Sequence, residues 1–270
     1  MLNIGIIGCG AIGVEVCKAI DTHIIKAKLV GIFDNNETNC ERLIRVLKDK
    51  PGIMSPADLI ANVDIVVECA SQAAVREFGE KVLISGKNLM VLSAGALLDS
   101  VLLRKLISAA AEHDCRIYVP SGAIAGLDGL KSANIASIER VVLTTTKSPA
   151  GLKGAPFIME NKIDLASIHD RTLLFEGNAM DAIMAFPANV NVAASLSLAG
   201  IGEKDTWVRI FVDPQASRNI HEITVEGAFG KFTGRIENVP SPANPRTSYL
   251  AALSAIATLK KITEPLQIGT

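Results

Sequence analysis

The sequence has few of the side chains that nucleic-acid binding requires. Aromatic residues make up 4% of its 270 residues, with a single tryptophan, so a stacking platform for single-stranded nucleic acid is not expected. The sequence also has no excess of positive charge, because its 27 lysines and arginines are balanced by 28 aspartates and glutamates. Binding by phosphate neutralisation normally requires a basic excess. We therefore expect no nucleic-acid partner.

Cysteine pairs of the kind that hold metals or form disulfides are missing as well. The five cysteines are odd in number and form no C-x-x-C motif, so neither a zinc ribbon nor a redox pair is indicated. We expect buried thiols in a reducing compartment and no metal site. The first lysine or arginine in the sequence is Lys18. A secretory signal normally begins with a basic segment, so this argues against such a signal and favours the cytoplasm.

One long uncharged stretch, residues 182–202, raises the question of a membrane span. It contains a proline, two asparagines and two serines, and lipid would leave such polar groups unsatisfied. We expect a buried helix beside a ligand site and no membrane partner. With 49% hydrophobic and 20% charged residues, the chain has the composition of a folded globular protein.

The first 120 residues alternate short apolar runs with segments of helical periodicity. The runs cover residues 3–8, 28–33, 63–69, 88–93 and 116–119, and the helical segments cover 12–20, 41–47, 74–84 and 100–111. Apolar strands separated by helices are typical of βαβ units with a parallel sheet buried on both faces. This pattern predicts an α/β fold of the Rossmann type, a doubly wound parallel sheet.

After residue 120 the pattern changes to alternation with a period of two. It occurs at residues 140–146, 172–175, 206–212, 220–225 and 231–236, which predicts a second α+β domain with a mixed or antiparallel sheet and a helix over 182–198 on one face. Asn244 and Pro245 resemble the cap and first residue of a last helix reaching about residue 261. We expect that helix to pack on the first domain, giving domains 1–122 plus 245–270 and 123–244.

A glycine motif and an acidic residue indicate a dinucleotide site in the first domain. Gly8-Cys9-Gly10-Ala11-Ile12-Gly13 follows the first expected strand and opens a helix, and Asp34 ends the second strand. The glycines permit a tight turn and close approach of a pyrophosphate to the helix N-terminus. Asp34 can accept hydrogen bonds from the adenosine ribose and repels a 2′-phosphate. The pattern favours NAD, with NADP possible.

Two further loops follow expected strand ends, where ligands of doubly wound sheets bind. Small residues there leave room for the ribose and nicotinamide; they are Ala70 and Ser71 after the third run, and the Pro120–Ala123 segment after the fifth. Tight turns alone would explain the same residues.

Four histidines are the candidates for a base that titrates near neutrality. His221 differs from the others because it begins an alternating strand and shares the parity of Ile223 and Val225, which directs it to the apolar face of the second sheet. A core histidine is the alternative. Cations that could bind a carboxylated substrate are Lys147, Lys153, Arg209, Arg218, Arg235 and Arg246. Lys153 lies between two glycines and Arg246 lies at the expected helix start, so we favour these two.

Five segments together resemble the L-aspartate dehydrogenase family. They are GIIGCGAIG at residues 5–13, YVPSGAIAGLDGL at 118–130, FPANVNVAASLSLAGIG at 186–202, RNIHEI at 218–223 and ENVPSPANPRTSYLA at 237–251. The likeness spans essentially the whole chain, and the last four segments are more specific than the glycine motif. The family turn usually reads N-P-K-T-S, whereas here Arg246 replaces the lysine.

The resemblance implies an NAD(P)-dependent oxidoreductase that interconverts L-aspartate with oxaloacetate and ammonia through iminoaspartate, linked to NAD biosynthesis. It implies that His221 is the active-site histidine, and that Ala123 or Ala125, together with Asn191, contacts the nicotinamide side of the cofactor. Because members of the family differ in cofactor preference, Asp34 carries the preference for NAD.

Two other readings fit parts of the sequence. A related Rossmann reductase of the homoserine dehydrogenase or dihydrodipicolinate reductase kind would share both domains. A non-catalytic NAD(H)-binding sensor would keep the glycine motif and Asp34 but would not need His221. In either case the second sheet has edges and an outer face that a homodimer would cover.

Overall fold

The computed structural model describes residues 1–187, 190–241 and 244–269, which form two compact units. Met1–Pro120 and Ala251–Ile268 make up the first unit, and Ser121–Leu250 make up the second. The chain thus leaves the first unit once and returns to it with its last helix. The divisions fall after residues 120 and 250, where the sequence placed them after 122 and 244.

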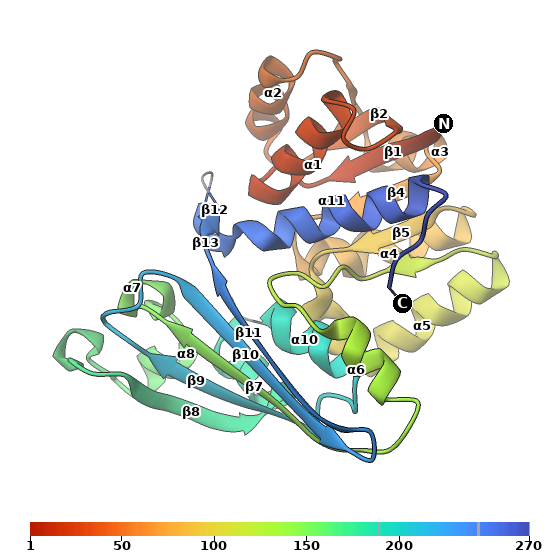
Figure 1. Cartoon of the computed structure of the whole chain (residues 1–270). Helices are drawn as coiled ribbons and strands as arrows, with labels where there is room; N and C mark the ends of the chain where they lie inside the picture. Colours follow the sequence, from red (N-terminus) through yellow and green to blue (C-terminus); the bar gives the residue numbers. More distant parts are fainter. Residues whose placement is uncertain (188–189, 242–243, 270) are drawn as a thin grey trace. The chain divides into compact units, whose positions relative to one another are not determined.

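The first unit is built on a six-stranded parallel sheet (Figure 1). Its order is β3-β2-β1-β4-β5-β6, so the direction of winding reverses between β1 and β4. The strands are β1 (Leu2–Ile7), β2 (Ala27–Phe33), β3 (Gly52–Ile53), β4 (Ile65–Glu68), β5 (Asn88–Val91) and β6 (Ile117–Tyr118). The predicted Rossmann fold is confirmed. Ligands of such sheets bind beyond the carboxyl ends of the strands at the reversal point.

Helices connect these strands, and side-chain caps fix where several of them begin. They are α1 (Ala11–Asp21), α2 (Glu37–Val46), α3 (Pro56–Ala61), α4 (Gln72–Ile84) and α5 (Ser100–Glu112), with a 3-10 turn at Ala94–Leu98. Asn36, Ser71 and Asp99 each accept hydrogen bonds from the first-turn amides of α2, α4 and α5. These caps satisfy amides that have no acceptor within the helix.

The last helix, α11 (Tyr249–Thr263), belongs to the first unit (Figure 1). Ala255 and Leu259 are fully buried in the same apolar cluster as Ile4 and Ile6 of β1. The predicted helix start at Asn244 is wrong. Residues 244–248 instead form β13 (Asn244–Ser248), which pairs with β12 (Pro240–Ser241), because strand pairing satisfies this backbone before the helix begins.

The second unit is built on a mixed five-stranded sheet of order β11-β10-β7-β9-β8. Its strands are β7 (Ile138–Lys147), β8 (Thr172–Asn178), β9 (Thr206–Val212), β10 (Asn219–Gly227) and β11 (Gly230–Asn238). The pairing of β7 with β9 is parallel and the other three pairings are antiparallel. The predicted second domain with a mixed sheet is confirmed.

One face of this sheet is apolar and carries the core of the second unit. Val141 and Leu143 of β7, and Ile223 and Val225 of β10, are all buried there. The shorter helices of this unit are α6 (Leu127–Ala133), α7 (Pro149–Leu152) and α8 (Pro156–Glu160). Because side chains alternate between the faces of a strand, Thr145 and Lys147 lie on the same face as Leu143.

The single helix predicted over residues 182–198 is also wrong, because the structure has two helices there. α9 (Ala179–Ala185) ends at Phe186, whose φ of −139° and ψ of 66° are not helical, and α10 (Val190–Ala199) follows. Proline disfavours helical backbone at the residue before it, and Pro187 follows Phe186 directly. Within the described residues no helix is long and apolar enough to cross a membrane.

Candidate active site

The loop between β1 and α1 is shaped by glycines at positions where a side chain would collide. Gly8 has a φ of +104°, and a Cβ there would lie 2.7 Å from backbone atoms of Cys69 and Ala70. A Cβ on Gly13 would overlap the carbonyl oxygen of Gly8. At Gly10, in contrast, nothing lies within 4 Å of such an atom. The loop therefore packs tightly against the end of β4 and stays open at Gly10.

The open side of this loop exposes the beginning of α1. Gly10 is the N-cap residue and provides no side-chain acceptor, so no cap occupies the first amides of this 11-residue helix. Ala11 and Ile12 are its first two residues, and such amides have no acceptor within the helix. They and the helix dipole favour an anion such as a pyrophosphate.

Asp34 follows β2 and is held by three donors. Its Oδ2 accepts from the amide of Cys9 at 2.8 Å, and its Oδ1 accepts from the amide of Asn36 at 2.9 Å and from Nδ2 of Asn39 at 3.2 Å. The carboxylate is thereby fixed between the glycine loop and the start of α2. The two oxygens have acceptor capacity beyond these three bonds, as ribose hydroxyls would require.

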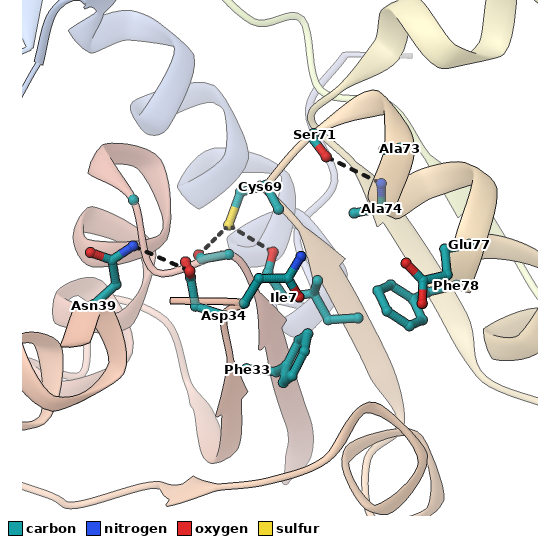
Figure 2. Close-up of a pocket in the computed structure, with 14 residues that line it drawn as sticks. Ile7, Phe33, Asp34, Asn39, Cys69, Ser71, Ala73, Ala74, Glu77 and Phe78 are labelled. Atoms are coloured by element: carbon teal, nitrogen blue, oxygen red, sulfur yellow. Dashed lines mark hydrogen bonds between the residues drawn. The ribbon is translucent and has the colours of Figure 1, made fainter. Parts of the chain in front are cut away.

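A pocket of about 320 Å³ joins these parts of the first unit (Figure 2). Gly8, Gly10 and Asp34 line it on one side, and Ala70 and Ser71 line it on the other. Open space at Gly10, uncapped amides on α1 and a fixed acid after β2 are the features that a dinucleotide needs. The residues present therefore fit this cofactor.

Cys69, at the back of the pocket, helps to hold the glycine loop. Its Sγ donates to the carbonyl oxygen of Gly8 at 3.1 Å and lies 3.6 Å from that of Ile7 (Figure 2). Burial raises the pKa of the Cys69 thiol well above its usual range, which keeps it protonated as a donor. All five cysteines are free thiols, and four of them are buried.

Glu68, the last residue of β4, is a buried carboxylate that the sequence did not single out. Its side chain is 2% exposed. Oε1 accepts from the amides of Ala70 and Ser71 and from the hydroxyl of Ser93, each at 2.8 Å. Oε2 accepts from the amide of Ser93 at 3.1 Å. Burial raises the pKa of Glu68, against the opposing effect of these hydrogen bonds. The carboxylate ties the Ala70–Ser71 wall of the pocket to the end of β5.

In the second unit, His221 lies on the apolar face of the sheet, as its parity predicts. It is 3% exposed and pairs with Thr145 across β10 and β7. Its Nδ1 and Oγ1 of Thr145 are hydrogen-bonded at 3.0 Å, which orients the ring. Burial, and secondly the charge of Lys147, lower the pKa of His221 to about 3. The imidazole is therefore neutral at physiological pH.

Lys147 ends β7 two residues after Thr145, on the same face as His221. It is 7% exposed, and no acceptor or acid pairs with its ammonium group among the described residues. Burial lowers its pKa to about 8. A buried cation without a protein counter-ion is costly, so this side chain is suited to receive an anion.

Lys147 also lines a pocket of about 390 Å³ within the second unit. The other lining groups used below are Arg218, Ser148, Ser217 and Asn219. Lys147 and Arg218 were two of the six cations noted in the sequence. Of the two that were favoured, Lys153 is exposed and is not among the described lining residues, and the side chain of Arg246 falls outside what the structure describes.

The remaining expected cofactor contacts lie in the second unit. Ala123 is buried, and its carbonyl oxygen accepts from Nδ2 of Asn238 at 2.9 Å. Ala125 is exposed in the same loop, and Asn191 is exposed near the start of α10. Asn238, which is 3% exposed, was not anticipated. It is the last residue of β11, and only the tertiary fold brings it to residue 123.

A Rossmann unit with a dinucleotide pocket, joined to a sheet unit with a buried histidine, defines an NAD(P)-dependent dehydrogenase. Residues 8–120 match the family described as "Homoserine dehydrogenase, NAD binding domain". Residues 128–262 match "Aspartate dehydrogenase, C-terminal". The first match covers the unit that contains the dinucleotide pocket. The second match narrows the class from NAD(P)-dependent dehydrogenases to aspartate dehydrogenases.

The chain belongs to the L-aspartate dehydrogenase family. It is 55% identical to the L-aspartate dehydrogenase of Methanococcoides burtonii over the full length of both chains, and 45% identical to that of Nitrosopumilus maritimus, also over both full lengths. The crystal structure of aspartate dehydrogenase from Thermotoga maritima matches with a TM-score of 0.76 and 28% identity, covering 100% of both chains. A homoserine dehydrogenase from Thiobacillus denitrificans, at 12% identity, shares the fold.

Proposed function

We propose that this protein is an L-aspartate dehydrogenase that interconverts L-aspartate with oxaloacetate and ammonia through iminoaspartate, with NAD as the preferred cofactor. The observation that carries the proposal is the buried pair of a neutral His221 and a cationic Lys147 on one sheet face. An oxo acid needs a proton carrier at its carbonyl and a cation for its carboxylate. Membership of the family supplies the substrate.

His221 carries protons in this mechanism. As ammonia adds to the ketone carbon, the neutral imidazole moves a proton from the attacking nitrogen to the carbonyl oxygen, which gives the carbinolamine. The ring then relays a second proton from the nitrogen to the hydroxyl, which leaves as water and gives the imine. A bound dinucleotide would supply the hydride that reduces this imine, with a proton from solvent. Thr145 fixes the ring by its hydrogen bond to Nδ1, and Ala123, Ala125 and Asn191 are proposed to contact the nicotinamide side.

The proposal is tested by following NADH oxidation with oxaloacetate in the presence and absence of ammonium. We expect turnover that requires both substrates. Turnover of an aldehyde or another oxo acid without ammonium would favour a related Rossmann reductase. Tight NADH binding with no turnover of any of these substrates would favour a sensor.

The preference for NAD is proposed to depend on Asp34. No lysine or arginine is among the described residues that line the dinucleotide pocket, so a 2′-phosphate would meet the carboxylate with no counter-ion. We expect Asp34→Asn to lower the ratio of kcat/KM for NADH to that for NADPH about tenfold or more, since a hydrogen bond to a charged group contributes about 1.5–3 kcal/mol.

The matched control is Glu41→Gln, an acid-to-amide change on the exposed side of α2 outside the pocket. It should leave the cofactor ratio unchanged. An Asp34→Asn enzyme with the wild-type ratio would show that another feature sets the preference.

We further infer a cytoplasmic homodimer whose iminoaspartate feeds NAD biosynthesis. Free cysteines support a reducing compartment. Trp207 and Leu173 on the second sheet are 41% and 42% exposed, which supports an interface between copies on that unit. Light scattering coupled to size-exclusion chromatography gives the oligomeric mass, and a mass of one chain would rule the dimer out.

A further inference from the structure

The pocket at the end of β7 contains two cations in different settings. Lys147 is buried and has no anionic partner among the described residues, whereas Arg218 is about half exposed and lies 4.0 Å from Glu237. Ser148, Ser217 and Asn219 add hydroxyl and amide groups to the lining. Two separate cations and several neutral donors in one lining match a ligand that carries two carboxylates.

The position of Lys147 relative to His221 decides which carboxylate each cation meets. Lys147 is two residues from Thr145, the hydrogen-bond partner of His221, and its charge acts on the pKa of that histidine. The proposed reaction occurs at the substrate carbon that lies beside His221. Of the two substrate carboxylates, the one bonded directly to that carbon is therefore the nearer to Lys147. Arg218 precedes β10 and lines the pocket from the segment 216–219.

We propose that Lys147 binds the carboxylate attached to the reacting carbon and that Arg218 binds the distal carboxylate, so that the two residues select a four-carbon dicarboxylate. This inference rests on the proposed function for the identity of the reacting carbon. Lys147 is then a substrate-binding residue, and Arg218 is the residue that separates dicarboxylates from monocarboxylates.

Burial distinguishes this role from a structural one. A lysine that served the fold would have an acid partner, and its loss would destabilise the protein. Lys147 has no such partner among the residues described, and burial alone lowers its pKa. Lys147→Met keeps a long unbranched side chain and removes the charge. This variant should therefore unfold at the same temperature as the wild type or higher, while it loses affinity for the dicarboxylate.

The experiment uses two unreactive ligands on the full-length enzyme with NADH bound. L-malate carries both carboxylates, and 2-hydroxybutanoate has a methyl group in place of the distal one. Dissociation constants come from calorimetry and from competitive inhibition against oxaloacetate. We expect Lys147→Met to weaken both ligands about 10- to 100-fold. We expect Arg218→Gln to weaken L-malate about 5- to 10-fold and to leave 2-hydroxybutanoate unchanged.

The control is Lys204→Met, which removes an exposed lysine of the same unit and should alter neither constant. Wild-type affinity of Lys147→Met for L-malate would overturn the assignment of Lys147. Equal weakening of both ligands by Arg218→Gln would overturn that of Arg218. If the wild type fails to turn over oxaloacetate with ammonium, the proposed function fails, and the L-malate measurements still decide whether the two cations bind a dicarboxylate.

A pH series adds a signature that only a titrating lysine would produce. The charged or titratable groups near Lys147 are His221 on β10, Arg218 before it and Asp213 after β9, whose amide donates to the Lys147 carbonyl at 2.8 Å. With its pKa near 3, His221 stays neutral at alkaline pH, so its charge does not change over this series.

Because the pKa of Lys147 is lowered to about 8, its ammonium group is lost as the pH rises through that value. L-malate binding to the wild type should weaken correspondingly above about pH 8. Lys147→Arg keeps its charge and should show pH-independent binding over the same range. A wild type with flat binding to pH 10 would overturn the assignment.

Discussion

Replacing His221 with alanine is expected to lower kcat about 10²- to 10⁴-fold, the range that positioned acid–base groups contribute. The residue is buried beside Lys147 and hydrogen-bonded to Thr145, so its removal takes away the proton carrier of carbinolamine formation and water loss. NADH binding should be spared, because the dinucleotide pocket lies in the other unit. Steady-state kinetics and NADH fluorescence titration measure the two quantities separately.

The control for this variant is Thr145→Val, which removes only the hydroxyl that orients the ring. Its kcat should fall by less than that of His221→Ala, because the proton carrier stays in place and loses only the hydrogen bond that orients it. A His221→Ala enzyme with near wild-type kcat would contradict the assignment. So would equal losses in the two variants, which would show that His221 acts only through the packing it shares with Thr145.

The dinucleotide site could be predicted because its requirements are local. The tight turn at Gly8 and the overlap that a side chain at Gly13 would cause are set by residues within the motif or directly beside it. The position of Asp34 could be predicted because the length of one βαβ unit places it at the end of the second strand. These features depend little on the rest of the chain, and Gly8 and Asp34 line one pocket.

The two cations proposed to bind the substrate could not be predicted in the same way. Lys153 and Arg246 were favoured for local reasons, a glycine neighbour and an apparent helix start. Lys147 and Arg218 lie in a common pocket, and that arrangement depends on how β7 pairs with β10. The parity of Lys147 with Thr145 and Leu143 was a usable signal, since it places the lysine on the apolar face with His221.

Two helix predictions failed for opposite reasons. At Asn244 a good capping sequence was overridden by a competing local structure, a short antiparallel pairing with residues 240–241. At Pro187 the signal was present and was missed, since a proline at that position ends a helix before it. The first failure shows that two local structures can compete for one segment, whereas the second kind of prediction can be improved.

Glu68 shows most clearly what the sequence hides, because its four donors come from residues 70, 71 and 93. Together they connect the end of β4 with the cap of α4 and the end of β5. Ser71, one of these donors, also accepts from Ala74 at 3.2 Å to begin α4. The carboxylate therefore holds the wall of the dinucleotide pocket from within the core, although it is absent from the pocket lining.

Replacing Glu68 with leucine should strongly destabilise the first unit, because the amide and hydroxyl of buried Ser93 would be left without an acceptor and the amides of Ala70 and Ser71 would each lose a hydrogen bond. A buried unsatisfied group costs about 1–3 kcal/mol and a lost hydrogen bond about 0.5–1.5 kcal/mol, so a loss of at least about 3 kcal/mol is expected. This corresponds to a fall in Tm of roughly 6–12 °C for a chain of this size. Glu68→Gln keeps one acceptor oxygen and should fall between the leucine variant and the wild type.

Differential scanning calorimetry measures the stability, and NADH titration below the transition measures the effect on the pocket. Both variants should bind NADH more weakly, in the order of their stabilities, because Ala70 and Ser71 lose the acceptor that positions them. Glu112→Leu, at the exposed end of α5, is the matched control and should change stability by less than about 0.5 kcal/mol. A Glu68→Leu variant as stable as this control would show that the amides find other acceptors, and that the carboxylate is not what holds the β4–α4 loop in place.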